Sequence, residues 1–304
     1  NRKLRQAIAI AMDWEEYIQI FEKGLATPAH GPLPPGLFGH NPEGSAGFNP
    51  YVYNKLEDGT VIRKSLEEAK TLLAEAGYPD GRNLKTGKPL VLSLDFQAAA
   101  SPGTKAVLDW YQKQFAKLGI QLDIRATDYN RFQDKVINGS HQLFLWGWLA
   151  DYPDAENFLF LLYGPNAKSK TGGSGENASN YQNAEYDRIF EKMRYMSDGP
   201  EKAKAIEQLI AIAQKDAPWT FGYFPTSAAA FHQWVYNGKP TQIVRNHIQY
   251  LRINPELRIE KIKEWNKPIY WPLFGIVVLL SLIIVPMYLL HKKREAMTAR
   301  KEKA

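Results

Sequence analysis

The sequence predicts an α/β fold that is followed by a single transmembrane helix. Two observations carry this prediction. Between residues 89 and 146, short apolar segments with strand character alternate with amphipathic helical segments, which is the order of a mainly parallel sheet. Residues 269–290 then form a charge-free run of 22 residues, long enough to cross a hydrocarbon core as a helix. The length of 304 residues accommodates one large core or two smaller ones.

The N-terminal part is expected to hold two helices separated by a loop. Residues 1–21 carry apolar positions at helical spacing. Residues 27–50 form a Pro- and Gly-rich loop that is too long for a simple turn. Residues 65–76 are expected to be a helix, because Ser65 and Glu68 match a capping box and a glycine follows at the end.

Residues 89–146 supply the expected sheet. Apolar residues alternate with polar ones in three segments and recur at helical spacing in the two segments between them. The expected strands are 89–96, 120–126 and 142–146, and the expected helices are 107–118, which Gly119 ends, and 128–138, which Asp128 caps.

Beyond this sheet the pattern predicts a polar surface loop, two helices, two short strands and an irregular segment. These are, in order, 164–183, 185–196, 200–216, 220–224, 228–235 and 237–266. Within the loop, TGGSGE (Thr171–Glu176) lacks the Gly-Lys-Ser/Thr that completes a phosphate-binding loop, so a phosphate-binding role is rejected.

The segment LFLWGWLADYPDAENFLF, residues 143–160, is the expected ligand site. It begins as an apolar strand and continues into a turn with two carboxylates, and open α/β sheets bind ligands at such strand ends. Two interpretations stay open. Trp146 and Trp148 contact a ligand beside an acid, or they pack in the core while Asp151 or Asp154 only caps the helix that follows.

The charge distribution argues against a nucleic-acid-binding body. The formal net charge is +6, but residues 291–304 hold six Lys or Arg against two Glu, which leaves +2 for everything before them.

An excess of Lys and Arg after the apolar run places the C-terminus in the cytoplasm and the preceding body outside the inner membrane. The chain does not open on Met or a signal peptide, although this topology requires export, so we expect the C-terminal part of a longer exported protein.

The residues offer no support for catalysis or for a metal site. The chain has no cysteine, which excludes thiol catalysis, disulfides and thiolate metal sites. The six histidines match no HExxH spacing, and neither a GxSxG elbow nor an SxxK pair is present. We therefore expect a protein that is not an enzyme and that carries no metal or cofactor.

Five motifs in the same order resemble one known family. They are RKLRQAIAIAMD (Arg2–Asp13), PAHGPLPPG (Pro28–Gly36), EEAKTLLAEAGYPDG (Glu67–Gly81), GWLADYPDAENF (Gly147–Phe158) and SNYQNAEYD (Ser179–Asp187). Together they resemble the oligopeptide- and dipeptide-binding proteins of ABC importers, extracellular solute-binding family 5, from about Arg2 to Trp234. The apolar run and the basic tail depart from the usual member of this family.

The resemblance implies the type II periplasmic-binding fold, of which this chain holds the C-terminal portion, mostly one lobe. It also implies that the acid of the GWxAD-type motif, here Asp151, receives the α-ammonium group of a peptide while Trp148 lies beside the bound backbone. Tyr152 and Trp146 of the same segment complete the expected ligand-binding set. The family also includes nickel, haem and sugar binders, and the matched Asp favours peptides.

The expected organisation has three parts. Residues 1–266 are the C-terminal part of a solute-binding domain, of which about 1–225 belong to one lobe and 226–266 return to the other lobe and form a linker. Residues 267–290 are a transmembrane helix, and residues 291–304 are a basic cytoplasmic tail.

Two functions are compatible with this organisation. The first is the substrate-binding component of an ABC importer, which binds peptides or a related small solute in the periplasm and delivers them to a permease. The alternative is a non-transporting periplasmic sensor or structural subunit on the same scaffold, anchored by its single-pass helix. We expect the short basic tail to leave no room for a cytoplasmic signalling domain, which weakens the hypothesis of a sensor.

Overall fold

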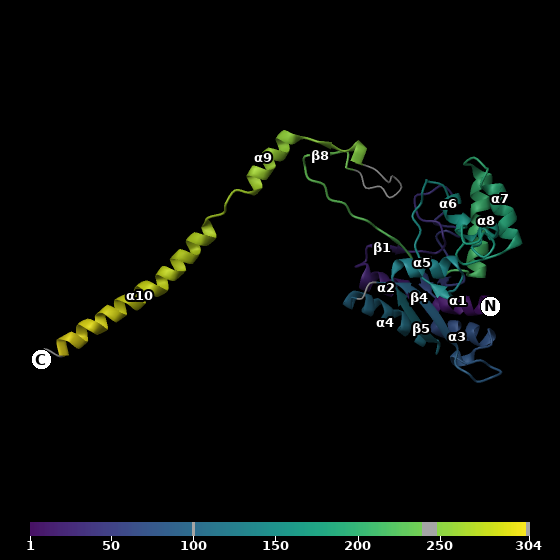
Figure 1. Cartoon of the computed structure of the whole chain (residues 1–304), viewed down its shortest axis with the longest axis horizontal. Helices are drawn as coiled ribbons and strands as arrows, with labels where there is room; N and C mark the ends of the chain where they lie inside the picture. Colours follow the sequence, from purple (N-terminus) through teal and green to yellow (C-terminus); the bar gives the residue numbers. More distant parts are fainter. Residues whose placement is uncertain (99–100, 239–247, 302–304) are drawn as a thin grey trace. The chain divides into compact units, whose positions relative to one another are not determined.

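The computed structural model describes residues 1–98, 101–238 and 248–301 (Figure 1). The chain divides into two compact units, the first comprising Asn1–Ala229 and the second beginning at Ala230. Each unit is described by itself. The expected return of residues 226–266 to a second lobe includes residues 239–247, and the expected tail includes residues 302–304. Both stretches lie outside the described residues.

The first unit opens with two helices in place of the single helix that was expected over residues 1–21. They are α1 (Arg2–Ala11) and α2 (Trp14–Phe21). The break occurs because Met12 is extended and Asp13 caps α2, its side chain accepting a hydrogen bond from the Glu16 amide at 2.9 Å. A cap of this kind starts a new helix and lets the two axes diverge.

Two short antiparallel pairs flank the next part of the chain. β1 (Ala26–Pro28) pairs with the distant β7 (Tyr223–Pro225), and β2 (Tyr53–Lys55) pairs with β3 (Val61–Arg63) as a hairpin. Between β1 and β2 the chain runs through turns, as expected for the Pro- and Gly-rich loop. The expected strand 220–224 is shifted to β7.

The helix that was expected over residues 65–76 is confirmed. α3 (Leu66–Glu75) begins at Ser65, whose side chain and that of Glu68 form the predicted capping box. The chain leaves α3 at Gly77, which adopts the left-handed backbone conformation (φ +95°) that favours glycine. A single 3₁₀ turn, η1 (Pro79–Gly81), follows.

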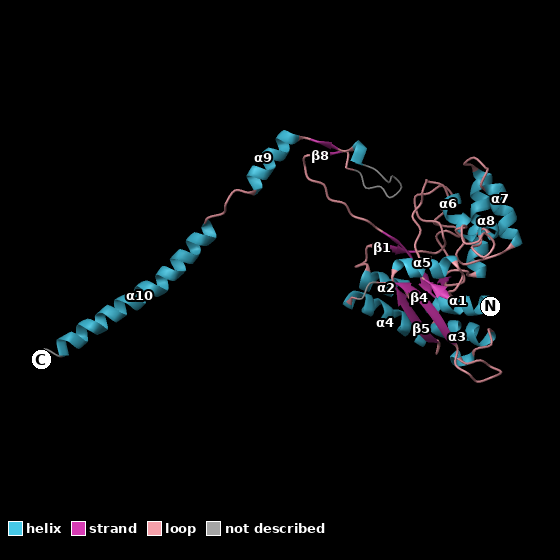
Figure 2. Ribbon diagram, in the orientation of Figure 1, coloured by secondary structure: helices cyan, strands magenta, loops and turns pink. Residues whose placement is uncertain are grey.

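A three-stranded parallel sheet forms the centre of the first unit, as the alternating pattern predicts (Figure 2). β4 (Val91–Gln97) lies between β5 (Gln121–Thr127) and β6 (Leu143–Phe144), and Leu94 is in register with both Ile124 and Leu143. The connecting helices are α4 (Pro102–Ala116) and α5 (Tyr129–Ile137), and Asp128 caps α5 as predicted.

The prediction of a buried strand over residues 142–146 is wrong in length and burial. β6 contains two residues, and the side chains of Leu145 and Trp146 are 38% and 42% exposed. The strand lies at the edge of the sheet and leaves the ladder after Phe144, so one side of the following residues lacks a neighbouring strand.

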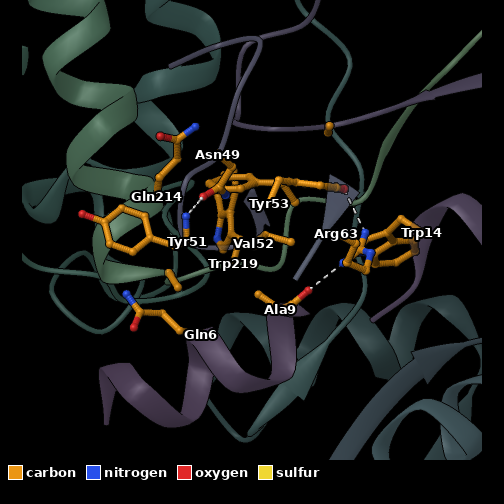
Figure 3. A pocket seen from close by; sticks show the side chains of 13 residues that line it. Gln6, Ala9, Trp14, Asn49, Tyr51, Val52, Tyr53, Arg63, Gln214 and Trp219 are labelled. Atoms are coloured by element: carbon orange, nitrogen blue, oxygen red, sulfur yellow. Dashed lines mark hydrogen bonds between the residues drawn. The ribbon is translucent and has the colours of Figure 1, made fainter. Parts of the chain in front are cut away.

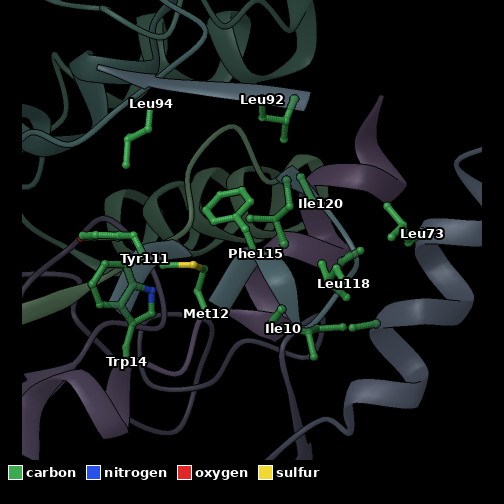
Figure 4. Packing of buried hydrophobic residues seen from close by; sticks show 14 of the residues in the cluster. Ile10, Met12, Trp14, Leu73, Leu92, Leu94, Tyr111, Phe115, Leu118 and Ile120 are labelled. Carbon is green, nitrogen blue, oxygen red and sulfur yellow. The ribbon is translucent and has the colours of Figure 1, made fainter. Parts of the chain in front are cut away.

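The two faces of β4 carry different side chains, because alternate residues of a strand point in opposite directions. Leu92 and Leu94 pack with Ile10 and Phe115 in the first hydrophobic core (Figure 4). Asp95 points the other way, is fully buried and forms an ion pair with Lys135 of α5. The sheet is thus covered by apolar packing on one face and tied to α5 by a charge pair on the other.

The remainder of the first unit is helical and has its own apolar core. Its elements are α6 (Glu156–Leu159), the 3₁₀ turns η2 (Phe160–Leu162) and η3 (Gly164–Asn166), α7 (Ala184–Met193) and α8 (Pro200–Asp216). Both expected helices are present, and Tyr186, Phe190 and Leu209 are fully buried between them.

The loop that was expected to lie on the surface at residues 164–183 is partly buried instead. Lys168 is 5% exposed, and its ammonium group donates to the carbonyl oxygens of Gly173 and Gly175 at 3.2 and 2.8 Å. The loop therefore folds around a buried cation, which its polar composition did not reveal. Its glycines offer carbonyl acceptors to that cation, whereas a phosphate loop offers amide donors.

The described residues of the second unit form an antiparallel strand pair and two α-helices. They are β8 (Val235–Tyr236), β9 (Arg252–Ile253), α9 (Pro255–Trp265) and α10 (Trp271–Lys301), with a 3₁₀ turn, η4 (Ile248–Tyr250), before β9. The expected strand 228–235 is wrong except at its last residue, since residues 228–234 pair with no described strand. The expected irregular segment contains α9, which Asn254 caps through the Leu257 amide at 3.0 Å.

Helix α10 is long and apolar enough to cross a membrane. An 18-residue window within its stretch Trp271–Arg294 has a mean hydropathy of 2.8, and no part of that window is buried in the protein. This stretch overlaps the expected span, residues 267–290, from Trp271 onward. The helix also continues to Lys301, so the first part of the basic tail is helical.

The two cores of the first unit are joined where α1 meets the C-terminal end of α8. The Arg5 guanidinium donates to the carbonyl oxygens of Asp216 at 2.6 and 3.1 Å and of Ala217 at 2.8 Å. The Gln6 amide donates to the Lys215 carbonyl at 2.7 Å. These carbonyls are the ones that a helix end leaves without intrahelical partners.

We expect Arg5→Ala to lower the free energy of unfolding by about 2–3 kcal/mol, because it removes charge-assisted hydrogen bonds from half-buried carbonyls. Arg2→Ala is the matched control. The Arg2 side chain is 49% exposed and lies 3.6 Å from Asp216, so its loss should cost about 0.5 kcal/mol. Urea unfolding in mild detergent measures both, and equal losses would contradict the assigned role of Arg5.

Candidate functional site

The candidate site is the segment between β6 and α6, residues 145–155. It leaves the sheet at the C-terminal end of β6, the edge at which open α/β sheets bind ligands. Trp146, Asp151 and Tyr152 are exposed there, whereas Trp148 is half-buried. The segment therefore presents polar and aromatic side chains to solvent on a backbone that starts and ends in regular structure.

A single buried oxygen holds two of the four predicted residues. The Asn157 side-chain oxygen accepts a hydrogen bond from Trp148 Nε1 at 3.1 Å and another from the Asp151 backbone amide at 2.9 Å. Asn157 is 3% exposed. The Trp148 ring also packs edge-on against Phe160, with ring centroids 5.4 Å apart. The structure thus fixes the indole and the backbone of the acid relative to one another.

Asn157 is the residue of this site that the sequence analysis missed. It lies inside the quoted motif, in the stretch AENFL, where it interrupts apolar residues. A buried carboxamide requires hydrogen-bond partners, so an Asn among core residues is itself a signal of a local network. Only the structure shows which donors it receives.

The other two predicted residues have different surroundings. The Tyr152 hydroxyl donates to the Glu156 carboxylate. Although the residue is 45% exposed, partial desolvation together with this hydrogen bond raises the pKa of Tyr152. The Trp146 ring packs edge-on against Phe132 of α5, with ring centroids 5.6 Å apart. The structure therefore links Trp148 with Asp151, while Tyr152 is tied to α6 and Trp146 to α5.

Neither Asp151 nor Asp154 is the N-cap of α6, which is Ala155, and Asp154 makes two side-chain contacts instead. One carboxylate oxygen accepts from the Glu156 amide at 2.9 Å, and the other accepts from Lys202 Nζ at 2.7 Å. Lys202 is 4% exposed and also donates to Asp198 at 2.9 Å. Burial opposes ionisation of Asp154, but the bonds from Lys202 and Glu156 outweigh it and lower the pKa of Asp154. The turn is thus pinned to the N-terminal part of α8.

A small cavity elsewhere in the first unit has a different character (Figure 3). It has a volume of about 10 Å³, which is room for about one water molecule. Its lining includes Gln6, Trp14, Asn49 and Arg63 but none of the four predicted ligand residues. Trp14 Nε1 is buried there without a hydrogen-bond partner. A volume of this size accommodates a water molecule and not an amino acid.

Among the described residues, no group of three or more His, Asp or Glu side chains is arranged to hold a metal ion. What the segment offers is an anionic carboxylate, a flat indole and a phenol. Such a set can receive a cationic group and cover an apolar surface.

A family model describing the bacterial extracellular solute-binding proteins, family 5 middle region, matches residues 1–170. Among curated proteins, the chain is 28% identical to haem-binding protein A of Haemophilus influenzae, over 75% of this chain and 38% of that protein. It is 30% identical to di/tripeptide-binding protein 4 of Pseudomonas aeruginosa, over 78% of this chain and 37% of that protein. The chain thus spans well under half the length of these relatives.

Solved structures show the same fold. The ABC transporter-associated periplasmic binding protein DppA from Helicobacter pylori, in complex with the peptide STSA, matches with a TM-score of 0.58 and 27% identity, over 74% of this chain and 38% of that one. The oligopeptide-binding protein AppA from Bacillus subtilis, in complex with a nonapeptide, matches with a TM-score of 0.64 and 21% identity, over 84% and 48%. This likeness confirms the predicted α/β fold.

We expect Asp154→Ala to lower the free energy of unfolding by about 2–3 kcal/mol near pH 7, because it leaves a buried ammonium with one partner. Ionised Asp154 stabilises the fold above its unfolded pKa. This stabilisation is lost as pH falls through the lowered pKa of the folded state, so the difference from the wild type should shrink below about pH 4.

Asp198→Ala is the matched control for this prediction, since Asp198 is the other partner of Lys202 but its side chain is 57% exposed. Its loss should cost about 0.5–1 kcal/mol. Urea unfolding over a series of pH values measures all three proteins. A pH-independent difference for Asp154→Ala would show that the Asp154 carboxylate does not carry the effect.

Proposed function

The chain belongs to the bacterial extracellular solute-binding proteins of family 5, and from this membership we propose that it is part of the substrate-binding component of an ABC importer. In this proposal it binds a peptide outside the inner membrane and delivers it to a permease. The peptide-binding relatives support this solute class, and the family of binding proteins supports a non-enzymatic role.

The pairing of Trp148 and Asp151 on Asn157 is the observation that supports a peptide ligand most directly. The Asp151 carboxylate supplies an anion for the peptide's α-ammonium group, and the Trp148 indole supplies a flat wall for the adjacent backbone. An ammonium group that loses water on binding needs an anion with hydrogen-bonding oxygens in return. Haem carries no ammonium group, so Asp151 favours a peptide over the ligand of the haem-binding relative.

Asn157 and Lys202 act as positioning residues in this proposal. Asn157 holds the Asp151 backbone, and Lys202 holds the turn through Asp154, so the acid is fixed before the solute arrives. A preorganised site loses less conformational entropy on binding than a mobile one.

We further propose that α10 crosses the inner membrane, with the first unit in the periplasm and the C-terminus in the cytoplasm. The charge-free length of the helix and the Lys and Arg residues that follow it support this orientation. A receptor tethered in this way meets its permease at a raised effective concentration.

Replacing Asp151 by Asn should weaken the binding of an unmodified peptide by about 2–5 kcal/mol, because the shape is kept while the charge that pairs with the ammonium group is lost. N-acetylation of the peptide should weaken binding to the wild type and change binding to the Asn variant much less. Calorimetry on the complete protein measures the four affinities.

Asp198→Asn is the control for this experiment, since it removes a carboxylate near the turn without touching Asp151. It should leave the affinities for both peptides within about twofold of the wild type. If the wild type binds free and acetylated peptides equally, ammonium capture is refuted, and a non-peptide solute or a structural role takes its place.

Topology is tested with protease and intact spheroplasts. Added protease should degrade the first unit and leave a C-terminal tag protected, because the tag follows the basic flank on the cytoplasmic side. Lysis before protease treatment is the control and should expose the tag. Loss of the tag in intact spheroplasts would reverse the proposed orientation.

A further inference from the structure

Helix α9 of the second unit has two faces of opposite character. Ile259, Ile262 and Trp265 follow one another at intervals of three residues and are 55%, 37% and 59% exposed. By the helical period of 3.6 residues they form one apolar stripe. The acidic residues Glu256, Glu260 and Glu264 recur at intervals of four and form a second stripe on roughly the opposite face.

Basic side chains accompany the apolar stripe. Arg258 lies within it and Lys263 beside it, and Lys267 lies two residues after the helix. Lys261, at the border of the two stripes, is ion-paired with Glu264 at 2.8 Å. Long basic side chains lay their apolar stems along such a stripe and keep their charged ends in a polar layer. The apolar stripe and its basic flank together match the surface of an anionic bilayer. A helix that lies on such a surface with this stripe down directs its acidic stripe toward water.

The connection between α9 and α10 keeps this face close to the apolar helix. Six residue steps separate Trp265 from Trp271, where α10 begins, and a fully extended chain of that length spans about 20 Å. Tyr270 and Trp271, at the junction, are 68% and 76% exposed. Aromatic residues of this kind concentrate at the level of lipid headgroups.

Trp265 has a second role at the end of the helix. Its ring lies 5.2 Å from that of Trp234, which is 6% exposed and also stacks on His232. This contact joins α9 to the β8–β9 hairpin within the second unit, while more than half of the Trp265 surface stays exposed. The apolar stripe is therefore not used up by packing inside the unit.

We propose that α9 lies in the headgroup layer of the membrane that α10 crosses, with its apolar stripe toward the acyl chains and its acidic stripe toward water. The partner is an anionic phospholipid surface. This inference rests on the proposed membrane anchoring. It adds that the segment next to the span lies flat on the bilayer and restricts how far the tethered body moves from it.

The absence of native cysteine makes the test direct. Single cysteines are introduced as Ile259→Cys and Ile262→Cys on the stripe, Glu260→Cys on the opposite face and Leu280→Cys inside α10, each labelled with an environment-sensitive fluorophore. The full chain is placed in vesicles of phosphatidylcholine and phosphatidylglycerol. Quenching by aqueous iodide and by a spin label near the lipid headgroups is measured at each site, together with quenching at Leu280 by a deep spin label.

We expect iodide quenching at residues 259 and 262 to be at least about twofold weaker than at residue 260, with headgroup spin-label quenching in the reverse order. Protection should fall in vesicles of phosphatidylcholine alone, and unchanged protection there would overturn the anionic preference. Equal iodide quenching at all three sites, or protection without lipid quenching because the stripe packs on protein, would overturn the proposal. If either result is found while the deep spin label still quenches the fluorophore at residue 280, only the proposal for α9 fails and the membrane span of α10 stands. If the deep spin label does not quench at residue 280, the proposed span itself is refuted.

Discussion

The hydrogen bonds between Arg5 and the C-terminal end of α8 hold the first unit together. Helix α8 ends at Asp216, and Ala217 then turns the chain with a left-handed backbone (φ 47°), which leaves several carbonyl oxygens pointing out of the helix. A guanidinium placed there satisfies them and complements the negative end of the helix dipole. Because α1 belongs to one apolar core and α8 to the other, this junction fixes the two cores relative to one another.

The same helix carries the constraint on to the candidate site. Its buried Gln214 donates to the carbonyl oxygens of His30, Ser45 and Phe48 and so ties down the loop that was recognised only by its Pro and Gly content. At its other end Lys202 holds Asp154. A helix of 17 residues is about 25 Å long, so α8 transmits the position of α1 to the turn that bears Asp151.

Local signals explain which elements were predictable from sequence. The start of α3 needs only Ser65 and Glu68, and the strands of the sheet follow from alternation that each segment carries by itself. The roles of Asn157 and Lys202 depend on partners that only the folded chain brings together: Lys202 pairs with a residue 48 positions away. Helix α9 was missed because its apolar residues recur at intervals of three without the alternating four, although Asn254 and Pro255 mark its start.

The burial of the site decides how strongly its acid can act. In water an exposed carboxylate attracts an ammonium group weakly, since solvent screens the pair and both groups are already hydrated. Asp151 is exposed in the described structure, whereas Asn157 behind it and Lys202 beneath the turn are buried. The backbone of Asp151 is therefore held in place by Asn157, while its side chain lies at the surface. In the role proposed for Asp151, selective capture of a charged solute requires a second surface that excludes water from the ion pair, so the fixed turn supplies only one of the two surfaces that the proposed site needs.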